Sequence, residues 1–147
     1  MVKLLDQIEA DFIQALKSKD KSLDVLRMLK SALKNAEIAK KEALNDTEIL
    51  LVIQKEKKQR QDSVEEFTKG NRLELVAKEK FEISILEKYL PKGLNEAELT
   101  KIIDAAISET GAKSKSEMGK VMSKVMPQIT GRATGEQVSK IVNSKLA

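Results

Sequence analysis

The sequence contains no cysteine, no histidine and no tryptophan among its 147 residues. Without cysteine and histidine the chain has no disulfide, no thiolate nucleophile, no imidazole base and none of the usual ligands of zinc, copper or haem. We therefore predict neither a metal site nor a cofactor. Aromatic residues make up only 3% of the chain, so the core must be built from aliphatic side chains.

Long apolar runs and strand patterns are also missing. Acidic residues interrupt the start of the chain at Asp6, Glu9 and Asp11, and no run approaches the roughly 20 apolar residues that a membrane span needs. No segment rich in β-branched or aromatic residues alternates with a period of two. These absences predict an all-α, cytoplasmic protein that has no membrane partner.

The sequence does contain a series of helix-capping patterns, in which a small polar residue precedes Glu or Gln by three positions. Five such pairs occur: Asn45 with Glu48, Asn71 with Glu74, Asn95 with Glu98, Ser114 with Glu117, and Thr134 with Gln137. Glycines at 70, 111 and 131 lie where a left-handed residue would end a helix. Together these signals predict seven helices, over residues 2–19, 22–43, 46–69, 72–90, 96–110, 115–129 and 135–146.

A break in this pattern occurs at Pro91 and Gly93, which form the only Pro-x-Gly of the chain. It separates the long predicted helices from the short ones, and the charge balance changes there as well. Residues 1–90 hold 18 Lys and Arg against 17 Asp and Glu, whereas residues 91–147 hold 9 against 6. We predict a long-helix N-terminal domain over 1–90 and a three-helix C-terminal domain over 95–147.

The third predicted helix has no apolar residue between positions 54 and 63, so hydrophobic packing alone cannot dock that stretch. Antiparallel pairing across the short link at Gly70 brings together positions whose numbers add to roughly 142. Arg60 then faces Glu82, and Ser63 faces Glu79. We predict a polar seam of these four residues, with Arg60, Glu79 and Glu82 ion-paired. It either specifies helix register or forms a polar binding site.

Catalysis by the two carboxylates of this seam is a weaker interpretation. Glu79 and Glu82 are close enough in the sequence for acid–base chemistry in principle. However, Arg60 would hold both carboxylates ionised, and the sequence shows no nucleophile or oxyanion hole to work with them.

The C-terminal part of the chain is basic, with seven Lys and Arg against two Asp and Glu from Gly111 onward. Lys120 and Lys124 lie one helical turn apart beside Gly119. The place of Gly119 inside a helix suggests a close approach, by a neighbouring helix or by a bound phosphate. Arg132 follows Gly131 in a loop that opens onto the last helix, where amide groups attract anions. The pattern favours an anion site, although a basic surface without a ligand is the simpler interpretation.

Nucleotide hydrolysis and base recognition fit this segment poorly. The Gly-x4-Gly-Lys-Ser/Thr order of a P-loop is absent. Residues 91–147 contain no aromatic side chain that could stack on an unpaired base. Any RNA partner should therefore be bound by its backbone and its shape.

In these segments the chain resembles the GatB/YqeY family and is closest to the stand-alone YqeY-like proteins. The similar residues include Met118 to Met122 with the later Met-Pro and Gly-Arg-Ala, and also Arg60 to Ser63 and Leu86 to Pro91. The resemblance implies an all-helical, bacterial protein whose C-terminal part is similar to the tail domain of the tRNA-dependent amidotransferase B subunit. It also implies tRNA contacts at Gly119, Lys120, Gly131, Arg132 and Ala133.

The resemblance further implies the label of a carbon–nitrogen ligase with glutamine as amido donor. The sequence lacks the kinase-like cradle and the Ser-Ser-Lys amidase constellation of those enzymes, so the resemblance alone does not decide whether the chain is an enzyme. Three hypotheses remain. The chain is an accessory protein that binds tRNA or another structured RNA, a protein–protein adaptor that uses residues 46–90, or a ligase component that acts together with a separate amidase.

Overall fold

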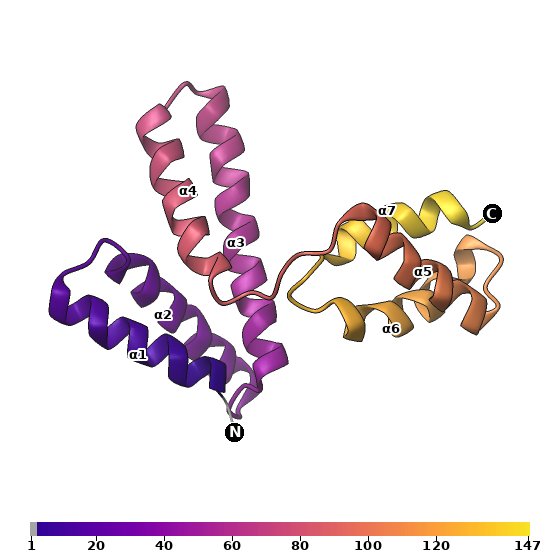
Figure 1. Ribbon diagram of the computed structural model, residues 1–147, viewed down its shortest axis with the longest axis horizontal. Coiled ribbons are helices and arrows are strands. Elements are labelled where there is room, and N and C mark those ends of the chain that lie inside the picture. The colour runs from indigo at the N-terminus through magenta and orange to yellow at the C-terminus, as the bar shows by residue number, and fades with distance from the viewer. Residues whose placement is uncertain (1–2) are drawn as a thin grey trace. The chain divides into compact units, whose positions relative to one another are not determined.

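The computed structural model describes residues 3–147 and contains only helices over that range, which confirms the all-α prediction (Figure 1). Residue 2 of the first predicted helix lies outside the described part. The elements are α1 (Lys3–Ser18), α2 (Leu23–Lys40), α3 (Asp46–Lys69), α4 (Leu73–Glu87), α5 (Glu96–Thr110), the 3-10 turn η1 (Lys115–Glu117), α6 (Met118–Ile129) and α7 (Gly135–Lys145). Over residues 3–147, none of these helices is both long and apolar enough to cross a membrane.

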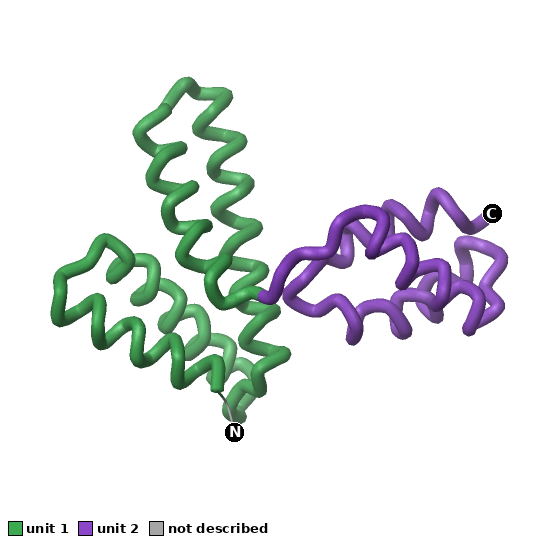
Figure 2. The backbone as a smooth tube through the Cα atoms, viewed as in Figure 1, with its two compact units in different colours: residues 1–90 green, residues 91–147 purple. Residues whose placement is uncertain are grey.

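The chain divides into two compact units, residues 1–90 and 91–147 (Figure 2). Each unit has its own aliphatic core. The first core includes Ile8, Leu29, Ile49, Ile53 and Leu86, and the second includes Ile103, Val121, Val125, Ile129 and Val142.

In the first unit, α1 and α2 form one antiparallel pair, and α3 and α4 form another that diverges from it (Figure 1). The core lies where α3 passes α1 and α2 and where the end of α4 meets them. No residue from 61 to 81 is buried. The far half of the α3–α4 hairpin therefore has only partly covered side chains.

In the second unit, α6 packs against both α5 and α7. The backbone of Ala147 pairs with Lys113 and Lys115 through two hydrogen bonds of 3.1 Å, which brings the chain end next to the start of η1. On the other side of the unit, the Leu94 amide donates to the Arg132 carbonyl at 3.0 Å. The segment leading into α5 is thus attached to the loop before α7.

Three of the five predicted caps are confirmed. The side chains of Asn45, Asn95 and Thr134 accept hydrogen bonds from the amides of Glu48, Glu98 and Gln137. Two predictions were wrong. Ser114 makes no side-chain cap bond, because its hydroxyl lies 2.7 Å from that of Ser116 instead. Asn71 does not open a helix, because it takes a left-handed φ of 56° in the turn that follows α3.

Two helices, α2 and α4, end three residues before their predicted limits. Lys41 adopts a left-handed φ of 67° and stops α2 three residues before the predicted end at 43. Residues 88–90 leave α4 for a tighter turn, in which each amide donates to the carbonyl three residues back. Neither helix end is followed by a glycine at these positions, so the sequence carried no signal for the earlier ends.

The expected close approach of a backbone to Gly119 is not found within the described chain. A Cβ atom placed on this residue would meet no heavy atom within 4 Å, apart from the helix itself. Glycine here therefore costs helix stability without any packing advantage inside the described structure.

We predict that Gly119→Ala stabilises the protein by about 0.5 kcal/mol, because alanine restricts the unfolded chain and favours the helix. Thermal unfolding followed by circular dichroism would measure this as a higher Tm. Gly111→Ala is the matched control. It should lower the Tm, since Gly111 has a left-handed φ of 70°. Destabilisation by Gly119→Ala would contradict the open space observed around that residue.

Candidate functional site

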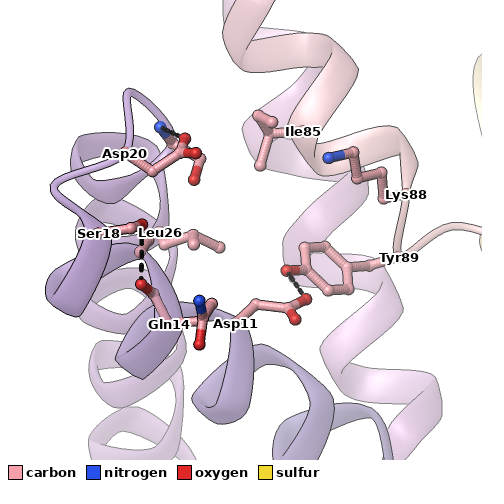
Figure 3. Close-up of a pocket in the computed structure, with 10 residues that line it drawn as sticks. Asp11, Gln14, Ser18, Asp20, Leu26, Ile85, Lys88 and Tyr89 are labelled. Atoms are coloured by element: carbon pink, nitrogen blue, oxygen red, sulfur yellow. Dashed lines mark hydrogen bonds between the residues drawn. The ribbon is translucent and has the colours of Figure 1, made fainter.

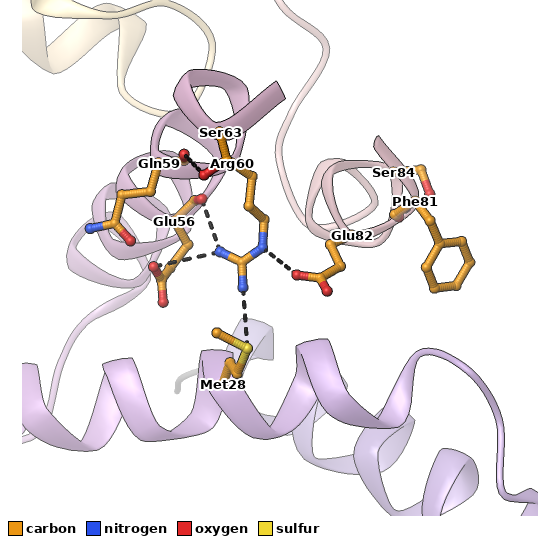
Figure 4. Close-up of polar contacts among 8 residues, drawn as sticks. All are labelled: Met28, Glu56, Gln59, Arg60, Ser63, Phe81, Glu82 and Ser84. Atoms are coloured by element: carbon orange, nitrogen blue, oxygen red, sulfur yellow. Dashed lines mark hydrogen bonds and ion pairs between the residues drawn. The ribbon is translucent and has the colours of Figure 1, made fainter. Parts of the chain in front are cut away.

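Arg60 of α3 is buried, with only 5% of its surface exposed. Its Nε donates to the Glu82 Oε1 of α4 at 3.0 Å, and Glu82 is itself only 8% exposed (Figure 4). The pair lies in the polar stretch of α3 that cannot dock by hydrophobic contact. The ion pair therefore takes the place of apolar packing in the middle of the hairpin.

The same guanidinium reaches two further groups that sequence reasoning missed. Its Nη1 donates to the Glu56 carbonyl at 3.0 Å and lies 3.7 Å from the Glu56 Oε2. Its Nη2 lies 3.7 Å from the Met28 Sδ of α2 (Figure 4). One side chain thus connects α2, α3 and α4. The spacing of four residues between Glu56 and Arg60 on one helix was a signal that could have revealed that contact.

Among the described residues, the other two predicted members of the polar seam, Ser63 and Glu79, form no direct bond to Arg60. The Ser63 hydroxyl donates to the Gln59 carbonyl of its own helix at 3.1 Å. Glu79 is half-buried, and among residues 3–147 it forms no ion pair with Arg60 within 4.0 Å. Burial raises the pKa of Glu79, and the nearby Glu82 charge raises it further against the opposing effect of Arg60.

A cavity of about 290 Å³ lies between α1, α2 and the end of α4 (Figure 3). Its polar lining includes Asp11, Gln14, Asp20, Lys88 and Tyr89. The Tyr89 hydroxyl donates to the Asp11 Oδ2 at 2.5 Å, and burial together with this bond raises the pKa of Tyr89. The carboxylate of Asp20 accepts from the Ser22 amide at 2.8 Å, which lowers the pKa of Asp20. Both carboxylates therefore already stabilise the fold around the cavity.

The predicted RNA-contacting residues have different environments in the second unit. Gly119 and Lys120 are exposed at the start of α6. Lys124 is exposed but pairs with Glu109 at 3.1 Å, and the Arg132 Nε donates to the Lys92 carbonyl at 3.1 Å. Gly131 and Ala133 are buried, so they position the loop and offer no side-chain surface to a ligand.

Three exposed lysines, Lys113, Lys115 and Lys120, lie near the start of α6 in the sequence, and we call them the basic edge. Glu117 lies among these lysines, and its carboxylate accepts from the Lys113 amide at 3.3 Å. None of the three forms an ion pair with a described residue, whereas Lys124 and Lys145 pair with Glu109 and Asp104. Sequence reasoning missed Lys113 and Lys115, although both belong to the basic run that begins at Gly111. In the described part of the chain, no group of three or more carboxylates could hold a metal ion.

Comparison with known proteins gives one family and a set of related chains. Residues 5–146 match the family model described as Yqey-like protein. The protein named altered inheritance of mitochondria protein 41, mitochondrial, of Pyrenophora tritici-repentis is 33% identical over 142 residues, which cover 93% of this chain and 77% of that protein. The protein of the same name from Saccharomyces cerevisiae is 32% identical over 131 residues, covering 82% and 71%.

These relatives contradict the predicted cytoplasmic location, because their names place them in mitochondria. Lack of cysteine and of long apolar runs does not separate the cytoplasm from the interior of an organelle, so composition could not decide this point. The two relatives are also fungal and give no support to a bacterial source. The likeness to an amidotransferase tail domain stays a prediction.

Removing Glu82 should destabilise the first unit strongly, because Arg60 would stay buried without its closest counter-charge. We expect Glu82→Ala to lower the free energy of unfolding by about 3 kcal/mol. Arg60→Met/Glu82→Leu should recover most of this loss, since apolar side chains of similar volume need no desolvation of charge. Urea unfolding followed by the fluorescence of Tyr89, the only tyrosine, reports on this unit. A loss below about 1 kcal/mol for Glu82→Ala would show that the pair is dispensable.

The raised pKa of Glu79 predicts a pH-dependent stability. A carboxyl group whose pKa is higher in the folded state contributes stability below its ordinary value of 4.5 and loses that contribution as the pH rises through the raised value. Glu79→Gln should therefore be more stable than the parent protein at neutral pH, and the advantage should disappear on acidification below 4.5. Urea unfolding at several pH values tests this, and an advantage independent of pH would contradict it.

Proposed function

Because the chain belongs to the YqeY-like family, we propose that it is an accessory protein that binds tRNA or another structured RNA through its C-terminal unit. In this proposal the protein supplies binding, and any amidotransferase chemistry is performed by a separate enzyme. The relation to glutamine-dependent carbon–nitrogen ligases is part of the proposal, and it rests on the similarity of the C-terminal segment to the tail domain of such enzymes.

The basic edge is the observation that supports RNA binding best. The side chains of Lys113, Lys115 and Lys120 are exposed and form no ion pair in the described chain. The one acid among them, Glu117, accepts from the Lys113 amide. Lysines without partners are available to neutralise phosphate groups and release their counterions.

The local backbone adds to this surface. α6 begins at Met118 directly after η1. The amides of Lys115, Glu117 and Met118 are bonded to carbonyls of the chain, so an anion would be favoured here by the partial positive charge of the helix start and not by free amides. Gly119 lies in the first turn of α6 with open space in front of it, so a phosphate could approach its backbone closely. Because the unit has no aromatic side chain, recognition should depend on backbone shape and not on base identity.

We predict that Lys115→Glu/Lys120→Glu weakens tRNA binding at least tenfold, because two phosphate contacts are replaced by repulsion. Fluorescence-anisotropy titration of bulk tRNA at two salt concentrations would measure both the Kd and its salt dependence. The slope of log K against log salt should fall in magnitude by roughly 0.9 for each lost contact.

The matched control is Lys101→Glu/Lys140→Glu, which makes the same change of net charge at two exposed lysines of α5 and α7. It should reduce affinity only slightly. Arg132 is left intact because its substitution would also break the bond to Lys92. Equal losses of tRNA affinity in both variants would show that binding is non-specific attraction between charges and is not located at the basic edge. Absence of tRNA binding by the parent protein would refute the proposal.

A further inference from the structure

α4 carries a row of apolar side chains at intervals of four residues, which therefore lies along one face of the helix. At the C-terminal end of this row Ile85, like the neighbouring Leu86, is buried in the core of the first unit. Nearer the start of the helix the row consists of Leu73, Ala77 and Phe81. All three are exposed, Leu73 by 65% and Phe81 by 38%. We call these three residues the outward stripe.

The outward stripe points away from the partner helix of the hairpin. Figure 4 shows Phe81 on the side of α4 opposite to Glu82, which faces Arg60 of α3. Within the first unit the far half of α4 packs along α3 and has no buried residue as far as position 81. The core of the unit therefore does not account for these apolar side chains.

The charges around the stripe are predominantly positive. Lys78 and Lys80 are exposed on either side of it, and neither forms an ion pair with a described residue. The acids of α4 are already engaged, since Glu74 pairs with Arg72, Glu82 with Arg60 and Glu87 with Lys57. The remaining acid, Glu79, is half-buried toward the hairpin interior. An apolar stripe with free cations at its borders is complementary to an apolar stripe bordered by carboxylates.

We infer that the outward stripe is a docking site for an acidic amphipathic helix of a partner protein. Leu and Ile side chains of that helix would pack around Phe81 and Leu73, as ridges of one helix fit between those of another. Asp and Glu at its borders would pair with Lys78 and Lys80. An aromatic ring surrounded by aliphatic side chains is a common anchor of such interfaces. This site lies in the other unit from the basic edge and takes a different class of partner.

The probe for this site is a fluorescein-labelled 20-residue helical peptide with a leucine stripe bordered by glutamates. Two further peptides serve as controls: one with lysines in place of the glutamates, and one with the same composition in scrambled order. Anisotropy titrations with the intact protein should give micromolar affinity for the acidic peptide alone. Binding should weaken with salt, because it involves exposed ion pairs.

Two sets of variants locate the binding. Leu73→Gln/Phe81→Gln and, separately, Lys78→Glu/Lys80→Glu should each reduce affinity for the acidic peptide at least tenfold. Ile38→Gln/Leu51→Gln is the matched control, because it replaces two other exposed apolar residues, on α2 and α3, and it should change affinity less than twofold. Glutamine keeps helix propensity high, and circular dichroism would verify that every variant is folded.

In the peptide titrations, three results would overturn the inference: no binding of the acidic peptide, equal binding of the scrambled peptide, or equal losses in the stripe and control variants. Sedimentation equilibrium of the protein alone tests whether a second copy of this chain occupies the stripe. Self-association of the parent protein that disappears in Leu73→Gln/Phe81→Gln would identify a second copy as the partner and would also overturn it. Binding of tRNA should be unchanged in the stripe variant, so this inference and the RNA proposal can fail independently.

Discussion

The ion pair between Arg60 and Glu82 is the constraint on which the first unit depends. A helix without an apolar residue from 54 to 63 has no hydrophobic reason to lie against its neighbour at that point. The buried guanidinium of Arg60 holds the helices together there by directional polar contacts. These are its 3.0 Å bond to Glu82 and its contacts with Glu56 and Met28. Because charges lose hydration on burial, such a pair adds little net stability over well-packed apolar side chains of the same volume.

The contacts of α4 become weaker from its end toward its start. Near the C-terminal end of α4, Leu86 lies in the core of the first unit. Just after the helix, the Tyr89 hydroxyl is bonded to Asp11, which lies 78 residues earlier in the sequence. In the middle Glu82 is held by Arg60, and beyond it toward Leu73 no side chain is buried. Local opening requires least free energy where few apolar contacts are lost. The tip of the hairpin is thus the part of this unit best able to adjust to a partner.

Local sequence predicted most of the helices because their capping signals act over three residues. It also indicated that Arg60 faces Glu82, since helix periodicity and a short link define which positions meet. Ser63 departs from that pattern because its hydroxyl finds an acceptor one turn back in its own helix. Lys124 and Arg132 were placed in the candidate site as unengaged cations. Their partners, Glu109 and the Lys92 carbonyl, lie 15 and 40 residues away, beyond the reach of local pattern.

The two bonds made by Arg132 also determine where this chain can be divided. Its carbonyl holds the Leu94 amide and its Nε holds the Lys92 carbonyl, so residues 92–94 belong structurally to the helices that follow them. A fragment that starts at residue 95, where the capping pattern places the first helix of that unit, would lose both bonds and leave the loop before α7 without its support. The separable modules instead meet between Leu90 and Pro91, and domain exchange or tag insertion would best be made at that peptide bond.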